Sequence, residues 1–443
     1  MKKKVLLVMV VMALGVLGHV VNGQDVQYRR SSLAMVLIES DNFPNKEFVS
    51  ASWDHYPFPD KYNKHDIQTK SVNIEKMKLT DQDLVKAGFL KDTLRNVFQI
   101  TKAKASQKGL KYLDGNRSIA VVQPTEKEIF QVKIDKMIAE THLANQVVAS
   151  WFDMGVDHQF DMALVQERGF YNASELEAGV AKGQARGMSA LGDAGEELIK
   201  NTFVTFTKLD FVENEPVARA VRDAAKKEIT KRMSGKPKML LTAALKGADV
   251  TYEKTKEGCS LWSKTFLYQL NWNDSTAMVF YRDYWNNPDV LMDSDLFKLN
   301  FVGVQYNQSL VTFSLGKKRA EDVIIDLALV RNLDNTFAKL QKKNDVFKPK
   351  VPIVSVNPIV AQIGEKESIT SKSEFEVLEM VWNQKQGKTI WKSIGKCKVD
   401  KKRPVWDNRY SVDEQTKADS DLHGTVLKGS KKIAPGMLIR QIK

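Results

Sequence analysis

Residues 186–212 read RGMSALGDAGEELIKNTFVTFTKLDFV, and the rest of the chain can be arranged around them. The first half carries apolar side chains at the three- and four-residue spacings of a helix. These side chains are Leu191, Ala194, Leu198 and Ile199. From Thr202 the period becomes two, and β-branched and aromatic residues dominate, which suits a half-buried strand. The stretch predicts a helix that runs into a long strand ending before Pro216.

The segments before this stretch alternate between strand and helix patterns. Short apolar runs predict buried strands, at 33–38, 118–122 and 160–165. Amphipathic patterns predict helical regions at 74–112, which begins near Thr80, and at 129–152. Strands separated by helices favour a sheet covered by helices.

The segments after the stretch extend this α/β pattern. Residues 217–233 predict a basic helix packed on the sheet, with an anionic lipid surface as the alternative location. Residues 264–285 predict a β-hairpin that extends the sheet or, alternatively, faces lipid in an oligomeric pore. A further strand at 310–315 and a long helix at 320–343 follow.

A change of pattern at 348–352, KPKVP, predicts a domain boundary. Beyond it, short apolar segments are separated by turn residues, which predicts a small all-β barrel or sandwich. These segments are 353–356, 359–363, 375–381, 390–399, 425–427 and 437–442. The chain is therefore expected to contain an α/β domain with a mixed sheet over 118–347. A 25–117 extension joins that domain, and a small β domain follows at 351–443.

Residues 1–24 have the pattern of a secretory leader. Three lysines precede an apolar body, and Val21-Asn-Gly23 offers small residues for cleavage. A single membrane anchor is the alternative, because the apolar run approaches spanning length. We expect an exported protein, located in the periplasm or associated with the outer membrane.

Charge and cysteine content narrow the function classes. Removal of the leader lowers the formal net charge from +13 to +10, because the leader contains three lysines. A basic surface attracts nucleic acid, anionic lipid or acidic polysaccharide, and export disfavours nucleic acid. Cys259 and Cys397 fall in different expected domains, so we expect two buried free thiols rather than a disulfide.

No residue pattern indicates catalysis, a metal or a cofactor, because a nucleophile elbow, a Walker loop and a dinucleotide fingerprint are all absent from the sequence. Two groups of polar residues could form a hydrolase or metal site but are more simply explained as surface loops. They are His55 with His65, and Asp153, Asp157, His158 and Asp161. Glu167 and Arg168 are expected to form ion pairs at the end of a strand.

Aromatic residues allow a second interpretation, a carbohydrate- or peptidoglycan-binding module. The residues that could stack on sugars are Trp53, Tyr56, Trp272 and Trp285. A periplasmic hydrolase that uses the His55–His65 loop or the Asp153–Asp161 region is a third.

The order of short motifs resembles curli export-channel subunits and the periplasmic flagellar-assembly T protein. The motifs are Ile119–Val122, Phe160 through Arg168, Leu191-Gly192 and Asn201 through Val212, then Val354 through Gly364, Phe375–Val377 and Pro435–Met437. The likeness covers about half the chain. It implies a non-enzymatic, oligomer-prone envelope scaffold that contacts envelope proteins or further copies of itself. Peripheral contact with the outer membrane is compatible with this class, and no small-molecule ligand is implied.

Overall fold

The structure is a computed structural model. It describes residues 31–89, 110–112, 120–122, 125–152, 160–172, 195–256, 259–311, 320–383, 385, 388–409, 424–430 and 432–442. The expected leader lies outside these residues.

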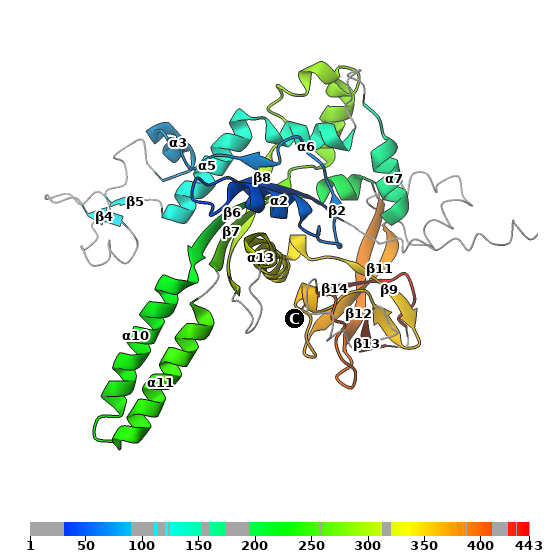
Figure 1. Cartoon of the computed structure of the whole chain (residues 1–443). Coiled ribbons are helices and arrows are strands. Elements are labelled where there is room, and N and C mark those ends of the chain that lie inside the picture. Colours follow the sequence, from blue (N-terminus) through cyan, green and yellow to red (C-terminus); the bar gives the residue numbers. More distant parts are fainter. Residues whose placement is uncertain are drawn as a thin grey trace, which may run out of the picture.

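A mixed six-stranded sheet forms the centre of the α/β domain (Figure 1). Its strands are β1 (Ser32–Ile38), β2 (Asn63–Lys64), β3 (Ser71–Val72), β6 (Thr202–Glu213), β7 (Cys259–Leu270) and β8 (Leu299–Val311). The order is β2-β1-β6-β7-β8, with β3 also paired to β1. β1 lies parallel to β6, and β6, β7 and β8 are antiparallel. The opening strand, although it belongs to the expected extension, is thus near the middle of the sheet.

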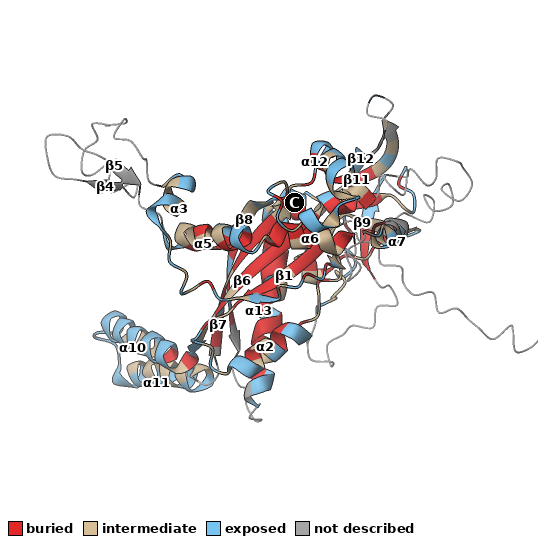
Figure 2. Ribbon diagram, turned by 90° about the horizontal axis from the view of Figure 1, so that it is seen from above, coloured by how far each residue is buried: buried red, intermediate tan, exposed pale blue. Residues whose placement is uncertain are grey.

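Helices cover both faces of the sheet, because its central strands alternate apolar residues toward two separate cores. On β6, Val204 and Phe206 belong to one core, and Phe203 and Leu209 to the other. The first core is closed by α5 (Glu126–Glu140) and α6 (Leu143–Trp151). The second is closed by α2 (Lys46–His55) and α13 (Glu321–Lys343). Figure 2 shows the buried strands between these helices.

The contact between α13 and the sheet includes a buried polar layer. Asn332 donates from Nδ2 to the Leu261 carbonyl at 2.8 Å, and Asn307 donates to the Asn332 carbonyl at 2.9 Å. Ser263 and Thr336 also bond to Asn332. Because these bonds need exact placement of donor and acceptor, they fix the position of α13 more narrowly than apolar packing alone.

A closed six-stranded antiparallel barrel follows, with the order β10-β13-β12-β11-β14-β9. Its strands are β9 (Val351–Val356), β10 (Ile359–Ala361), β11 (Glu374–Asn383), β12 (Lys388–Val399), β13 (Thr425–Gly429) and β14 (Leu438–Gln441). All six strands were predicted, and the barrel has its own apolar core around Phe375 and Ile439. The predicted class, a mixed α/β domain followed by a small β domain, is confirmed.

Between β6 and β7 the chain leaves the sheet as a helical hairpin of α10 (Asn214–Arg232) and α11 (Lys238–Thr255). We call residues 214–256 the arm. Figure 1 shows the arm extending away from the sheet. The basic helix was predicted correctly, but its predicted packing on the sheet is wrong. α10 packs on α11 instead, and both helices extend away from the sheet.

Two predicted strands are wrong. Residues 163–165, expected to be strand, begin α7 (Ala163–Asn172), and the expected turn at 166–169 lies inside that helix. Residues 276–285, expected to return as the second strand of a hairpin, form α12 (Asp274–Val279) and a π-helical turn, η1 (Phe280–Tyr284). Short, mainly apolar runs do not distinguish a strand from a buried helix, and Arg282 and Asp283 also interrupt the second run.

Other elements were predicted with wrong limits or neighbours. β5 (Ala120–Val122) is a strand, but it pairs with β4 (Leu110–Tyr112) in a separate two-stranded sheet. The expected helix at 129–152 is divided into α5 and α6 at His142, whose φ of 48° is left-handed. Of the helical region expected at 74–112, the structure shows α3 (Asp81–Lys86), which starts at the expected Thr80 in a capping box, while residues 90–109 lie outside the described residues.

The remaining elements are short. They are the 3₁₀ turns η2 (Pro288–Val290), η3 (Asp345–Phe347) and η4 (Glu365–Glu367).

Candidate functional site

The arm is the most exposed feature of the described chain. Only Asn214 and Ala218 are buried in α10, and no residue of α11 is buried. Val217 and Val221 are 47% and 60% exposed on α10, although apolar side chains at four-residue spacing usually face a core. The two helices therefore present surface on nearly all sides (Figure 2).

Polar contacts join α10 to α11. Tyr252 donates to Glu215 at 2.8 Å, and Lys226 pairs with Asp249 at 2.5 Å. The guanidinium of Arg222 lies 4.5 Å from the centre of the Tyr252 ring. Surface ion pairs contribute roughly 0–1 kcal/mol each. The arm is thus held together by weak contacts rather than by a substantial core.

The base of the arm is continuous with the sheet. β6 and β7 remain paired up to Glu213 opposite Cys259, and α10 begins at the next residue. Ser260 donates to the buried Asn214 side chain at 2.8 Å. Because no loop separates β6 from α10, the arm has a defined direction relative to the sheet.

The tip of the arm is a tight turn. Gly235 has φ of +84°, a left-handed conformation that glycine adopts without strain. The Lys236 amide donates to the Met233 carbonyl at 3.0 Å, and Pro237 precedes the first residue of α11. The side chains of Met239 and Leu240 next to this turn are 86% and 54% exposed.

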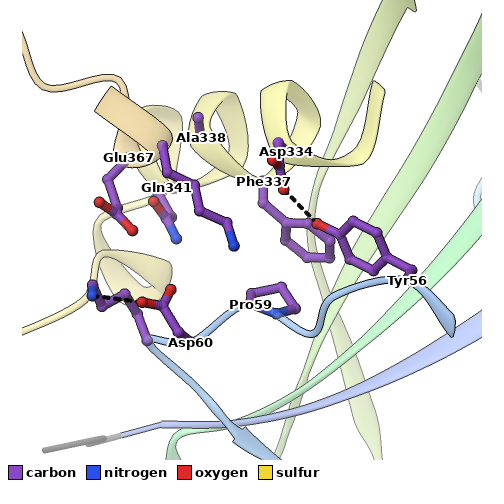
Figure 3. A pocket seen from close by; sticks show the side chains of 10 residues that line it. Tyr56, Pro59, Asp60, Asp334, Phe337, Ala338, Gln341 and Glu367 are labelled. Carbon is purple, nitrogen blue, oxygen red and sulfur yellow. Dashed lines mark hydrogen bonds and ion pairs between the residues drawn. The ribbon is translucent and has the colours of Figure 1, made fainter. Parts of the chain in front are cut away.

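A second feature lies where the α/β domain meets the barrel (Figure 3). The lining residues are Tyr56, Pro59, Asp60, Lys61, Asp334, Phe337, Ala338, Gln341, Lys366 and Glu367. Tyr56 donates to Asp334 at 2.9 Å, and Lys61 donates to Asp60 at 2.9 Å. The free space is only about that of one water molecule. This is a packed junction between domains and is too small to bind a substrate.

Burial changes the pKa of two carboxyl groups at this junction. It raises the pKa of Glu367 and also that of Asp334. Glu367 accepts hydrogen bonds from the Gly364 amide at 2.8 Å and from Asn408 at 3.0 Å. The Glu367 carboxyl therefore organises the barrel loops that face the α/β domain.

His65 and Arg168 meet in the α/β domain, contrary to expectation. Arg168 was expected at a strand end, but it lies in α7, donates to His65 Nδ1 at 3.2 Å and stacks 4.7 Å from the centre of the Trp151 ring. His65 Nε2 lies 2.9 Å from the Val147 carbonyl oxygen. Both ring nitrogens thus have structural partners. His55 is exposed on α2, and its Nδ1 lies 2.7 Å from the Ala51 carbonyl.

The other expected chemical residues are also placed structurally. Asp161 accepts a hydrogen bond from the Ala163 amide at 2.7 Å, at the start of α7. Asp153, Asp157 and His158 lie outside the described residues. Within the described part of the chain, no three His, Cys, Asp or Glu side chains gather closely enough to hold a metal ion.

Cys397 is a free, buried thiol in the barrel, so it is not bridged to Cys259. Burial raises the pKa of the Cys397 thiol to about 12, which leaves it protonated and unreactive at neutral pH.

The aromatic residues weighed for glycan binding do not form an exposed platform. Trp53, Tyr56 and Trp272 are buried. Trp285 is half-buried and lies 5.9 Å from the Phe152 ring, centre to centre. Trp272 donates to Glu196 at 2.6 Å. These rings are parts of the core.

Sequence reasoning missed the arm as a surface, although one signal was present. Residues 214–256 contain many alanines and lysines and few large apolar residues, so two successive helices there cannot both bury a wide apolar face.

The described helices include none that is long and apolar enough to cross a membrane. No protein-family model matches the chain, and a search of curated proteins finds no significant match.

Proposed function

We propose that this protein is a non-enzymatic component of the cell envelope, exported by its leader, that acts as a scaffold or assembly factor through protein contacts. The arm is the surface that makes these contacts. Its partner is another envelope protein or a second copy of the chain.

The observation that supports this proposal is the exposure of the arm. Helices of a folded domain normally bury an apolar stripe on their own core. α10 and α11 instead leave Val217, Val221 and Val250 in solvent at 47%, 60% and 46% exposure. The arm contributes few side chains to the core, so we assign it a role in binding a partner protein rather than in stability.

The sequence allows the arm to be removed cleanly. Deletion of residues 215–257 joins Asn214 to Gly258 between the paired residues Glu213 and Cys259. Asn-Gly is the favoured two-residue turn of a β-hairpin, so β6 and β7 are expected to stay paired. We expect a folded protein that has lost its contacts.

The experiment combines this deletion with site-specific crosslinking in intact envelopes. A photo-reactive amino acid at Val221, exposed on the arm, is expected to capture a defined partner or a second copy. The same group at Val354, which is 48% exposed on the barrel, is the matched control. Cells that express the intact protein should yield this assembly, and cells that express the variant without the arm should not.

Two results would contradict the proposal. One is the absence of any specific crosslink from Val221 in envelopes where the protein is abundant. The other is recovery of the protein only from the cytoplasm, with residues 1–24 still attached.

A further inference from the structure

The end of the arm differs in charge from the rest of the chain. Residues 229–248 contain five basic residues and no aspartate or glutamate. The basic residues are Lys231, Arg232, Lys236, Lys238 and Lys246. Arg232 pairs with Glu228 at 2.7 Å, one residue outside this stretch. The described residues offer no acidic partner to Lys231, Lys236 or Lys238.

The same end carries apolar side chains in solvent. Met239 is 86% exposed and Leu240 is 54% exposed, one and two residues after Lys238. Figure 1 shows this end of the two helices projecting away from the rest of the chain. A projecting end of this kind can rest on a broad surface.

We propose that the tip of the arm, residues 231–241, docks on the surface of an anionic lipid bilayer. Lysines next to exposed apolar side chains are the combination that peripheral membrane proteins use. The ammonium groups meet the lipid phosphates, and Met239 and Leu240 enter the boundary between head groups and acyl chains. An anionic surface complements the uncompensated charge, and lipid also accommodates the apolar pair.

Nucleic acid is the main competing surface. It would also attract the lysines, and some minor-groove proteins insert methionine or leucine between base pairs. Lipid is favoured over nucleic acid because the proposed leader carries the chain out of the compartment that holds nucleic acid. This inference goes beyond the proposed protein contacts, because it concerns only the tip and leaves the flanks of α10 and α11 free for a partner.

The test is sedimentation of the purified protein, without residues 1–24, with lipid vesicles. We expect binding to vesicles that contain phosphatidylglycerol, weak binding to pure phosphatidylcholine, and release as salt is raised. Each basic residue near an anionic surface contributes about fivefold to partitioning. The triple variant Lys231→Gln, Lys236→Gln and Lys238→Gln should therefore bind about 100-fold more weakly.

The control removes the same charge from the barrel, at the exposed residues Lys372, Lys401 and Lys402, and should bind like the wild type. Met239→Ser with Leu240→Ser tests the apolar part and should weaken binding about tenfold. Circular dichroism of each variant verifies that the helices remain.

Three outcomes would overturn the proposal. They are equal loss of binding in both lysine triples, full binding by the tip triple, and retention of duplex DNA by a wild-type protein that ignores vesicles. Because the tip variants keep Val221, they separate this inference from the protein-contact proposal. If the tip variants lose vesicle binding but still crosslink from Val221, the tip binds lipid and the protein contacts do not depend on it.

Discussion

His65 Nε2 is directed at the Val147 carbonyl, and Nδ1 receives a hydrogen bond from Arg168. The first nitrogen therefore carries the only ring proton, and the imidazole is neutral in the fold. Burial, followed by the charge of Arg168, lowers the pKa of His65 to about 3 from an ordinary 6.5. Histidine is common in catalytic sites, but His65 instead links its own segment to Val147 and Arg168 through hydrogen bonds.

A dependence of stability on pH follows from this shift. Between pH 6.5 and about 3 the unfolded chain binds the His65 proton and the folded chain does not. The free energy of unfolding therefore falls as pH falls through this window, by at most about 1.4 kcal/mol per pH unit from this group. His65→Gln should reduce that slope, measured by urea unfolding from pH 6.5 to 4. An identical slope in the variant would refute the assignment.

Asn145 joins α6 to a distant loop. Its Nδ2 lies 2.7 Å from the Leu291 carbonyl oxygen and 2.8 Å from that of Ser294. Asn145→Ala leaves these buried acceptors without a donor, so we expect a loss of about 1–3 kcal/mol in the free energy of unfolding. Gln146→Ala, at the next and less buried position, should cost less than about 1 kcal/mol. Equal costs at the two positions would contradict this role.

At the scale of elements, α13 and the arm are opposite cases. α13 is long and amphipathic, and its buried face includes Leu329, Leu333 and Phe337. The arm has two helices of comparable length and almost no buried residues. Helix stability in proteins comes mainly from tertiary packing, so the two should differ in local stability.

Amide hydrogen exchange measures this difference directly. We expect the amides of α10 and α11 to exchange through local opening, well before those of α13, which should approach the global free energy of unfolding. Mass spectrometry of peptides from the two regions provides the comparison. Equal protection in solution would mean that the arm is covered, for example by a second copy of the chain.

At the scale of the whole molecule, two domains meet at a polar junction. The barrel core around Phe375 is separate from the cores on the two faces of the sheet. Lys350, at the start of the barrel, donates to Glu197 at 2.8 Å, and Lys61 lies 6.0 Å from the centre of the Trp406 ring. These contacts orient the barrel on the α/β domain, whereas its stability comes from its own strands.

The barrel should therefore fold alone. We expect a fragment of residues 349–443 to unfold cooperatively on heating and to give dispersed amide signals in an NMR spectrum. A random-coil spectrum for the fragment would show that the junction is required for folding.

The sequence by itself determined the elements whose pattern is long and local. The two-residue period of 202–212, the apolar face of 320–343, the helix start at Thr80 and the six strands of the small β domain all appear as predicted. Each depends on side chains within a few residues of one another. The absence of motifs for nucleotides and nucleophiles could likewise be seen from the letters.

Tertiary structure alone decided how those elements are placed. Residues 163–165 and 276–279 are helical, and Leu164, Val165 and Ala277 contact a core that distant segments build. β5 pairs with β4 instead of joining the main sheet, and α10 leaves the sheet together with α11, which the pattern of neither segment alone predicted. A short apolar run shows that a segment is buried, but the shape of what buries it depends on residues a hundred or more positions away.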